Sequence, residues 1–78
     1  MKNDLQRKIY NIIQSFNLTT REIEPSLLLF EDLGFDALDY LELEINLENT
    51  FVIDIVDNDL TECKTVADVV EYIANKLI

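Results

Sequence analysis

Most side chains in this sequence that could take part in chemistry are carboxylates. A run of them recurs at short intervals in the middle of the chain, between leucines and an isoleucine: Asp36, Asp39, Glu42, Glu44 and Glu48. Such a strip could dock onto Lys and Arg of a partner protein, bind a divalent cation weakly, or supply an acid–base pair for hydrolysis. The alternative is a solvated helix face that keeps a small protein in solution. From the residues alone, a docking surface and a solvated face are equally well supported.

The sequence argues against a dedicated metal site and against hydrolysis. It has no Asp-x-Asp-x-Asp-Gly loop, so we predict no metal site. It has no histidine, and Cys63 is its only cysteine, which excludes a catalytic histidine, a thiolate metal site and an intrachain disulfide. A chain of 78 residues is too small to offer a deep pocket for a buried catalytic acid. We therefore predict that the protein is not an enzyme and that Cys63 is an ordinary loop or helix-end residue.

The net charge restricts the partners of the chain. With 16 acidic and 6 basic residues, the formal net charge is -10. This charge repels nucleic acid and anionic membranes and favours basic patches on other proteins. No apolar run approaches the ~18 residues of a membrane span, and the spaced apolar residues at the N-terminus are unlike a signal peptide. We expect a cytoplasmic monomer with no nucleic acid partner and no membrane insertion.

Helices must position these side chains, because one Gly and one Pro are too few turn residues for an all-β chain. Apolar periodicity predicts a first helix over residues 4–16, capped by Asn3 or Asp4 and ended by Asn17. The connection over residues 17–35 is long, but its apolar residues indicate that it packs onto the core. Thr19 has the spacing of a capping box with the Glu three residues later, so one short helical turn is expected there.

The middle helix is expected to begin at the N-cap Asp36, with Asp39 in its first turn, and to run to about Phe51. Its apolar residues predict a broad face, on which Leu41 is expected to pack in the core; the face comprises Leu38, Leu41, Leu43, Ile45, Leu47 and Phe51.

Residues 52–56 have the composition of a strand but no partner strand, so we expect an extended connection, and then a helix of one or two turns from residue 57. Thr65 and Asp68 have cap-and-N3 spacing for a last helix, whose expected buried residues are Val66, Val69, Val70, Ile73 and Leu77. The predicted fold class is all-α: a single domain over residues 1–78, forming a small four-helix bundle of three longer helices and one short one, with a long loop after the first.

One stretch is more specific than composition or periodicity. Residues 31–39 read Glu-Asp-Leu-Gly-Phe-Asp-Ala-Leu-Asp. They resemble the signature of acyl carrier proteins, in which an Asp-Ser-Leu tripeptide opens the second helix. The resemblance continues through Leu41-Glu42-Leu43, Leu47-Glu48 and Phe51, resumes at Lys64-Thr65-Val66, and covers nearly the whole chain, including Asp68-Val69-Val70 and Tyr72-Ile73. It is closest to the stand-alone bacterial or organellar type used in fatty acid synthesis.

The resemblance implies a 4'-phosphopantetheine arm that is attached to the serine of this tripeptide and carries acyl groups as thioesters. Asp36 and Leu38 flank the attachment position, but the residue there is Ala37. Alanine has no hydroxyl, so this sequence stays in the bare form. Neither Ser15 nor Ser26 has the motif around it. Two origins of Ala37 stay open: an introduced substitution that blocks loading, which we favour, and natural loss in a pseudo-carrier.

The resemblance also implies partners: a phosphopantetheinyl transferase, and acyl-chain synthesis or transfer enzymes with basic docking patches. The residues expected to contact them are Asp36, Leu38, Asp39, Glu42, Ile45 and Glu48. Tyr40, Glu44 and Asn46 depart from the family pattern and hint at a specialised pathway. Two other functions stay open: an interaction adaptor without cargo, and a peptidyl or aminoacyl carrier, which the acidity of the chain and its Asp-Leu-Gly-x-Asp start disfavour.

Overall fold

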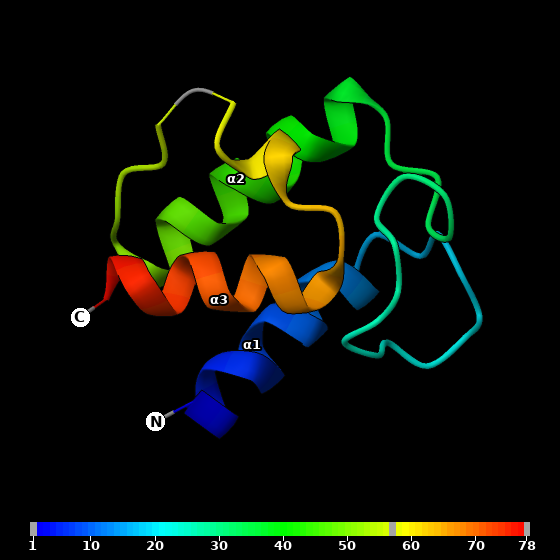
Figure 1. Cartoon of the computed structure of the whole chain (residues 1–78), viewed down its shortest axis with the longest axis horizontal. Coiled ribbons are helices and arrows are strands. Elements are labelled where there is room, and N and C mark those ends of the chain that lie inside the picture. The colour runs from blue at the N-terminus through cyan, green and yellow to red at the C-terminus, as the bar shows by residue number, and fades with distance from the viewer. Residues whose placement is uncertain (1, 57, 78) are drawn as a thin grey trace.

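The computed structural model describes residues 2–56 and 58–77. Within these ranges there are three α-helices, α1 (Lys2–Gln14), α2 (Ala37–Phe51) and α3 (Val66–Lys76), and one short 3-10 helix, η1 (Leu60–Glu62) (Figure 1). The described residues contain no strand, only an isolated antiparallel bridge between Leu28 and Thr65. The all-α prediction is confirmed, but the short fourth helix is reduced to a 3-10 turn of three residues.

The first helix begins and ends slightly earlier than predicted. Because α1 starts at Lys2, Asp4 lies in its first turn and neither Asn3 nor Asp4 is its cap. The helix ends at Gln14, so Ser15 follows it and donates its hydroxyl to the carbonyl of Ile12 at 2.6 Å. Asn17 has a φ of 57° and turns the chain away, as a helix-stopping Asn does.

The long connection between α1 and α2 has no helical turn at Thr19. The Thr19 hydroxyl accepts the N–H of Arg21 at 3.0 Å, which makes a local turn instead, so the predicted short helix is wrong. An isolated turn fixes several backbone dihedrals for one hydrogen bond, and such a nucleus rarely survives alone. The connection does pack onto the core as expected, through the buried side chains Ile23, Leu27, Leu29 and Leu33.

The core lies between the three helices and this connection. It is entirely apolar within the described residues, and its largest buried side chain, Phe35, stacks on Phe16 and meets Tyr40 edge-on, each at a centroid distance of 5.3 Å. Of the residues expected to be buried by the last helix, Val66, Val69, Val70 and Ile73 are in the core. Leu77 is 49% exposed, because α3 ends at Lys76 and leaves it past the packed surface.

The connection from α2 to η1 is non-helical, as expected, and only partly packed. Ile55 is buried, whereas Val52 and Val56 are exposed. A hydrogen bond from the N–H of Ile55 to Oε2 of Glu48 (3.0 Å) holds the connection against the end of α2. The predicted start of the short helix at residue 57 lies outside the described residues, and η1 begins at Leu60.

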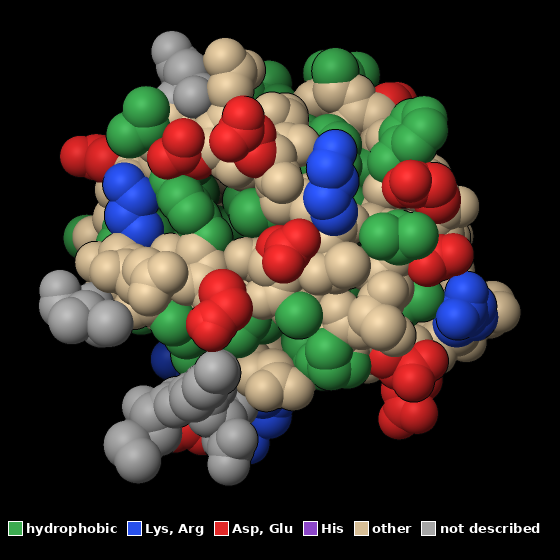
Figure 2. All heavy atoms as spheres, in the orientation of Figure 1, with side chains coloured by type: hydrophobic (Ala, Val, Ile, Leu, Met, Phe, Trp, Pro, Cys, Tyr) green, Lys and Arg blue, Asp and Glu red, His purple; other side chains and the backbone are tan. Residues whose placement is uncertain are grey.

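The surface carries the acidity of the sequence. Acidic side chains are spread over the face shown in Figure 2, with few basic ones among them. Among the described residues, no helix combines the length and the apolar character needed to cross a bilayer.

Candidate functional site

A reciprocal pair of hydrogen bonds fixes the start of α2. Oδ1 of Asp36 accepts the N–H of Asp39 at 2.9 Å, and Oδ2 of Asp39 accepts the N–H of Asp36 at 3.0 Å. The chain reaches this cap through Gly34, whose φ of 72° lies in the left-handed region that favours glycine. The predicted N-cap is therefore confirmed, and it makes Ala37 the first helical residue.

Ala37 stands at an open helix N-terminus. Its side chain is exposed, and so is that of Leu38. Within the described residues, no acceptor is found for the backbone N–H groups of Ala37 and Leu38. Unpaired N–H groups and the positive end of the helix dipole together favour an anion at such a place.

The acidic residues of the predicted strip make different contacts in the structure. Asp36 and Asp39 are engaged in the cap. Glu42 is exposed on the helix surface, whereas Glu48 is half-buried and accepts the N–H of Ile55. Glu48 therefore has a structural role, which the sequence did not reveal because its partner lies seven residues away in an irregular segment.

The apolar face of α2 is also divided. Leu43 and Leu47 are fully buried, whereas Leu38, Leu41 and Ile45 are 69%, 49% and 47% exposed. The prediction that Leu41 packs in the core is wrong, because the helix directs Leu43 and Leu47 at the core and rotates Leu41 away from it. The three exposed side chains form an apolar ridge on α2 beside Glu42, which we call the ridge.

A pocket of about 340 Å³ opens between α2 and η1, directly beside Ala37. Its α2 side consists of Ala37, Tyr40, Leu41 and Glu44; the opposite wall is Asn58, Leu60 and Thr61. The sequence does not predict this wall, because nothing local in residues 58–61 shows that they fold back against α2. Tyr40 and Glu44, two of the residues that depart from the family pattern, both line the pocket.

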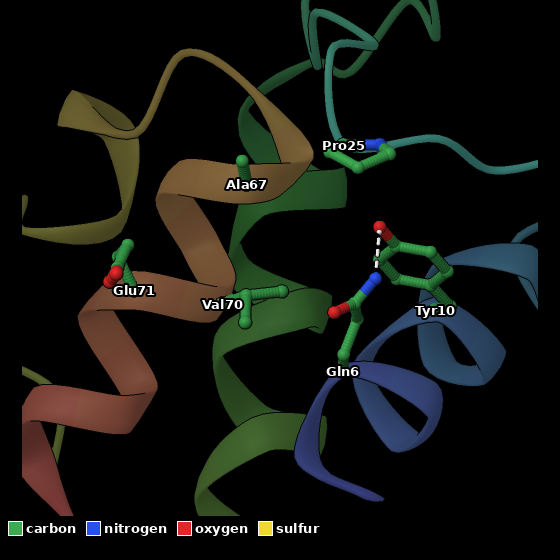
Figure 3. A pocket seen from close by; sticks show the side chains of 6 residues that line it. All are labelled: Gln6, Tyr10, Pro25, Ala67, Val70 and Glu71. Atoms are coloured by element: carbon green, nitrogen blue, oxygen red, sulfur yellow. Dashed lines mark hydrogen bonds between the residues drawn. The ribbon is translucent and has the colours of Figure 1, made fainter. Parts of the chain in front are cut away.

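A second hollow, of about 280 Å³, lies between α1 and α3. In Figure 3 the side chains of Gln6 and Tyr10 come from α1 and those of Ala67, Val70 and Glu71 from α3, with the ring of Pro25 above them. The amide Nε2 of Gln6 donates to the Tyr10 hydroxyl oxygen at 2.9 Å. None of the predicted site residues lines this hollow.

The titratable groups with altered pKa values have structural causes. Burial, followed by the nearby acids Asp68, Asp59 and Glu62, raises the pKa of Cys63 to about 11. Its thiol therefore stays protonated at neutral pH and is a poor nucleophile. Cys63 caps the end of η1 and is buried, which confirms that it is a helix-end residue. The described residues include no group of three or more His, Cys, Asp or Glu able to hold a metal ion.

The comparisons with known proteins agree with this geometry. Residues 7–73 match the model of the family described as phosphopantetheine attachment site. The acyl carrier protein of Helicobacter hepaticus is 41% identical over 66 residues, which cover 83% of this chain and 87% of that protein. The chain belongs to the acyl carrier protein family. The acyl carrier protein of Chlorobium phaeobacteroides is 37% identical over 73 residues, 92% of this chain and 94% of that protein.

Solved structures show the same fold. A Mycobacterium tuberculosis protein assigned to the acyl carrier proteins superposes with a TM-score of 0.83 and 37% identity, over 91% of this chain and 96% of that one. The Thermotoga maritima acyl carrier protein superposes with a TM-score of 0.78 at 23% identity, over 97% and 89% of the two chains, and at that identity it supports the fold alone.

Membership of this family decides whether the chain is an enzyme. Acyl carrier proteins carry cargo and are not enzymes, so the prediction that the chain is no enzyme is confirmed. The chain has the phosphopantetheine attachment domain, and members of the family typically interact with enzymes of acyl-chain synthesis.

Proposed function

We propose that this acyl carrier protein serves fatty acid or related acyl-chain synthesis, and that position 37 is where the 4'-phosphopantetheine arm belongs. The observation that carries the proposal is the open N-terminus of α2. Ala37 is exposed there, behind the Asp36–Asp39 cap, with the N–H groups of Ala37 and Leu38 available to an anion. The phosphate of the arm is such an anion.

The residue at position 37 does not fit covalent attachment. Attachment needs a hydroxyl oxygen that forms a phosphodiester, and the alanine side chain has none. The chain with Ala37 is therefore locked in the bare form, with Asp36 and Leu38 still flanking the attachment position. An arm supplies a terminal thiol on which acyl groups travel as thioesters.

Restoring the hydroxyl tests this proposal. We expect Ala37→Ser, incubated with coenzyme A and a phosphopantetheinyl transferase that loads another acyl carrier, to gain the mass of one arm. The parent chain, which keeps Ser15 and Ser26, should gain nothing. A matched control is Ala67→Ser, which places a serine in the first turn of α3 behind its own capping box. Equal loading of both serine variants, or of neither, would contradict the proposal.

The surface of α2 is proposed to meet the partner enzymes. The contacts expected are those predicted from the sequence, with Leu38 and Ile45 on the ridge and Glu42 beside it. Exposed ion pairs contribute only about 0.2–1 kcal/mol each, so they orient and accelerate encounter more than they add affinity. We expect Ile45→Asp to weaken binding to the transferase severalfold in Ala37→Ser, whereas Asn11→Asp, on the exposed surface of α1, leaves it unchanged.

A second function, an adaptor that binds a partner without cargo, is favoured by one observation: the ridge is exposed in a chain that has no attachment hydroxyl. An adaptor should keep a partner from its native lysate through high salt and lose it in Ile45→Asp. Loss of every partner at high salt counts against an adaptor. We propose that the protein is a cytoplasmic monomer, whether it acts as a carrier or as an adaptor.

The origin of Ala37 is decided by the intact mass of the protein from its native source. A mass above the printed sequence by one oxygen and one arm means that serine is the natural residue and that the protein is a working carrier. A mass equal to the printed sequence means that alanine is natural, and it favours the adaptor.

A further inference from the structure

The pocket beside Ala37 has one wall that lies outside the α-helices. Asn58, Leu60 and Thr61 form this wall, and Asp59 lies between the first two in the chain. The helical part of the wall, η1, has only three residues. A 3-10 helix of this length has poor hydrogen-bond geometry and does not by itself define where it lies against α2.

Apolar packing holds the wall only in part. Leu60 is fully buried and keeps η1 near the core. Burial of a leucine is non-directional, however, so it opposes exposure of that side chain without fixing the orientation of its neighbours. The hydrogen bond between Glu48 and the N–H of Ile55 holds the connection upstream, before the exposed Val56.

Tyr72 of α3 supplies the directional contact. Its hydroxyl donates to Oδ2 of Asp59 at 2.8 Å. Burial, and then the Asp59 carboxylate, raise the pKa of Tyr72 to about 12, so the donor keeps its proton at neutral pH.

We propose that Tyr72 is a positioning residue, whose hydrogen bond to Asp59 latches η1 onto α3 and thereby sets the width of the pocket beside Ala37. Asp59 transmits the contact directly, since its neighbours Asn58 and Leu60 are both wall residues. Without the latch, η1 pivots on Leu60 and moves away from α2. A role of the pocket in receiving the arm or its cargo depends on the proposed function. The contact between Tyr72 and Asp59 and its effect on η1 do not depend on it.

The only cysteine of the chain reports on this motion. Cys63 ends η1, is 7% exposed, and points its Sγ at the carbonyl of Asp59, 3.9 Å away. It reacts with iodoacetamide only when η1 lifts, because the buried thiol is both shielded and protonated. When opening and closing are fast, the labelling rate follows the population of the open form. The chain with Ala37 is used unchanged, so the result does not depend on loading.

The key variant is Tyr72→Phe, which keeps the ring and its contact with Lys76 (5.6 Å) and removes only the hydroxyl. The matched control is Tyr10→Phe, which removes the hydroxyl that accepts from Gln6 in the hollow between α1 and α3 (Figure 3). Only Tyr72→Phe removes a hydrogen bond to a charged group, the Asp59 carboxylate. We expect Cys63 labelling to accelerate about tenfold in Tyr72→Phe and to stay near the parent rate in Tyr10→Phe.

Two further measurements separate a latch from general loosening. Amide exchange in α1 should keep its parent rate in Tyr72→Phe, while the N–H groups of Glu62 and Cys63, which bond within η1, exchange faster. Asp59→Ala should accelerate exchange of these two N–H groups as Tyr72→Phe does, and the double variant should add little more, because both remove the same bond. Unchanged labelling, equal acceleration of α1 exchange, or additive effects of the two variants would each overturn the proposal.

Discussion

The N-termini of α2 and α3 are built alike and used differently. Each has a capping box, Asp36 with Asp39 and Thr65 with Asp68. In α3 the first N–H groups are covered, because Leu27 and Pro25 of the long connection accept from Val66 (3.0 Å) and Ala67 (2.9 Å). In α2 the corresponding groups meet no acceptor within the described residues. Capping therefore decides where a helix starts, and the path of a distant segment decides whether that start is open to a ligand.

The two helices also differ in how many of their side chains are buried. Four side chains of α3 are in the core, and its first residue, Val66, is completely buried. Only Leu43 and Leu47 of α2 are fully buried, although α2 is the longer helix. Because α2 leaves part of its apolar face exposed, few of its side chains pack in the core. The side chains of α3 and of the long connection make up much of the rest of the core.

The largest expected effect compares two isoleucines on these helices. Ile73 of α3 is fully buried and Ile45 of α2 is about half exposed. We expect Ile73→Ala to lower the free energy of unfolding by about 2–5 kcal/mol, because it leaves a cavity. Ile45→Ala should lower it by less than about 1 kcal/mol. Urea denaturation at constant salt measures both, and similar losses would show that the exposed side of α2 is packed in solution.

The first helical residues provide the next test. Val66→Ser removes a buried apolar side chain and buries a hydroxyl, and should cost about 2–4 kcal/mol. Ala37→Ser changes an exposed position and should stay within about 0.5 kcal/mol of the parent. The same denaturation experiment compares them. A large cost for Ala37→Ser would mean that the N-terminus of α2 is not open.

The two capping boxes should contribute equally. Asp36→Ala and Thr65→Ala each remove a side-chain acceptor for the N3 N–H, and each should destabilise by about 1 kcal/mol. Thermal melting followed by circular dichroism gives both values. If Asp36→Ala is much less costly than Thr65→Ala, the two starts are not locally equivalent, and the comparison above fails.

The opposite ends of these helices also differ. Val52, which ends α2, has a φ of 54° and is 88% exposed, whereas Leu77, which ends α3, has a φ of -90°. The left-handed conformation is strained for a β-branched residue and suits Asn or Gly. We therefore expect Val52→Asn to raise the free energy of unfolding by about 0.5–1 kcal/mol. Leu77→Asn is the control and should bring no gain.

The smallest effect concerns pH. Hydrogen bonds from the backbone of Thr65 and Lys64 lower the pKa of Asp68 in the folded protein. A lowered pKa means that this contribution to stability is complete above the unfolded pKa of about 4 and is lost as the pH falls through the folded value. The parent should thus exceed Asp68→Asn in melting temperature at pH 7, by a margin that shrinks below pH ~4. A margin that is constant down to pH ~2 would contradict the role of this carboxylate.

Where sequence and structure agree, the signal is local. The positions of Asp36, Thr65 and Asp68 predict two helix starts, because a cap involves residues three apart. The repeat of Val66, Val69, Val70 and Ile73 predicts a buried helix face. Two of the failures come from marginal turns: Thr19 makes a local hydrogen bond but no helix, and the short helix after residue 57 is only a 3-10 turn.

Sequence by itself determined the helical class, the two capped starts, the acidity, and the absence of a hydroxyl at position 37, since each depends on residue type or short spacing. Only the tertiary structure decided that Leu41 is exposed, that Glu48 holds Ile55, that η1 faces Ala37 across a pocket, and that Tyr72 reaches Asp59. These facts depend on which surfaces meet after the chain folds back. A helical repeat specifies one face of a helix, but the partner that covers that face comes from elsewhere in the chain.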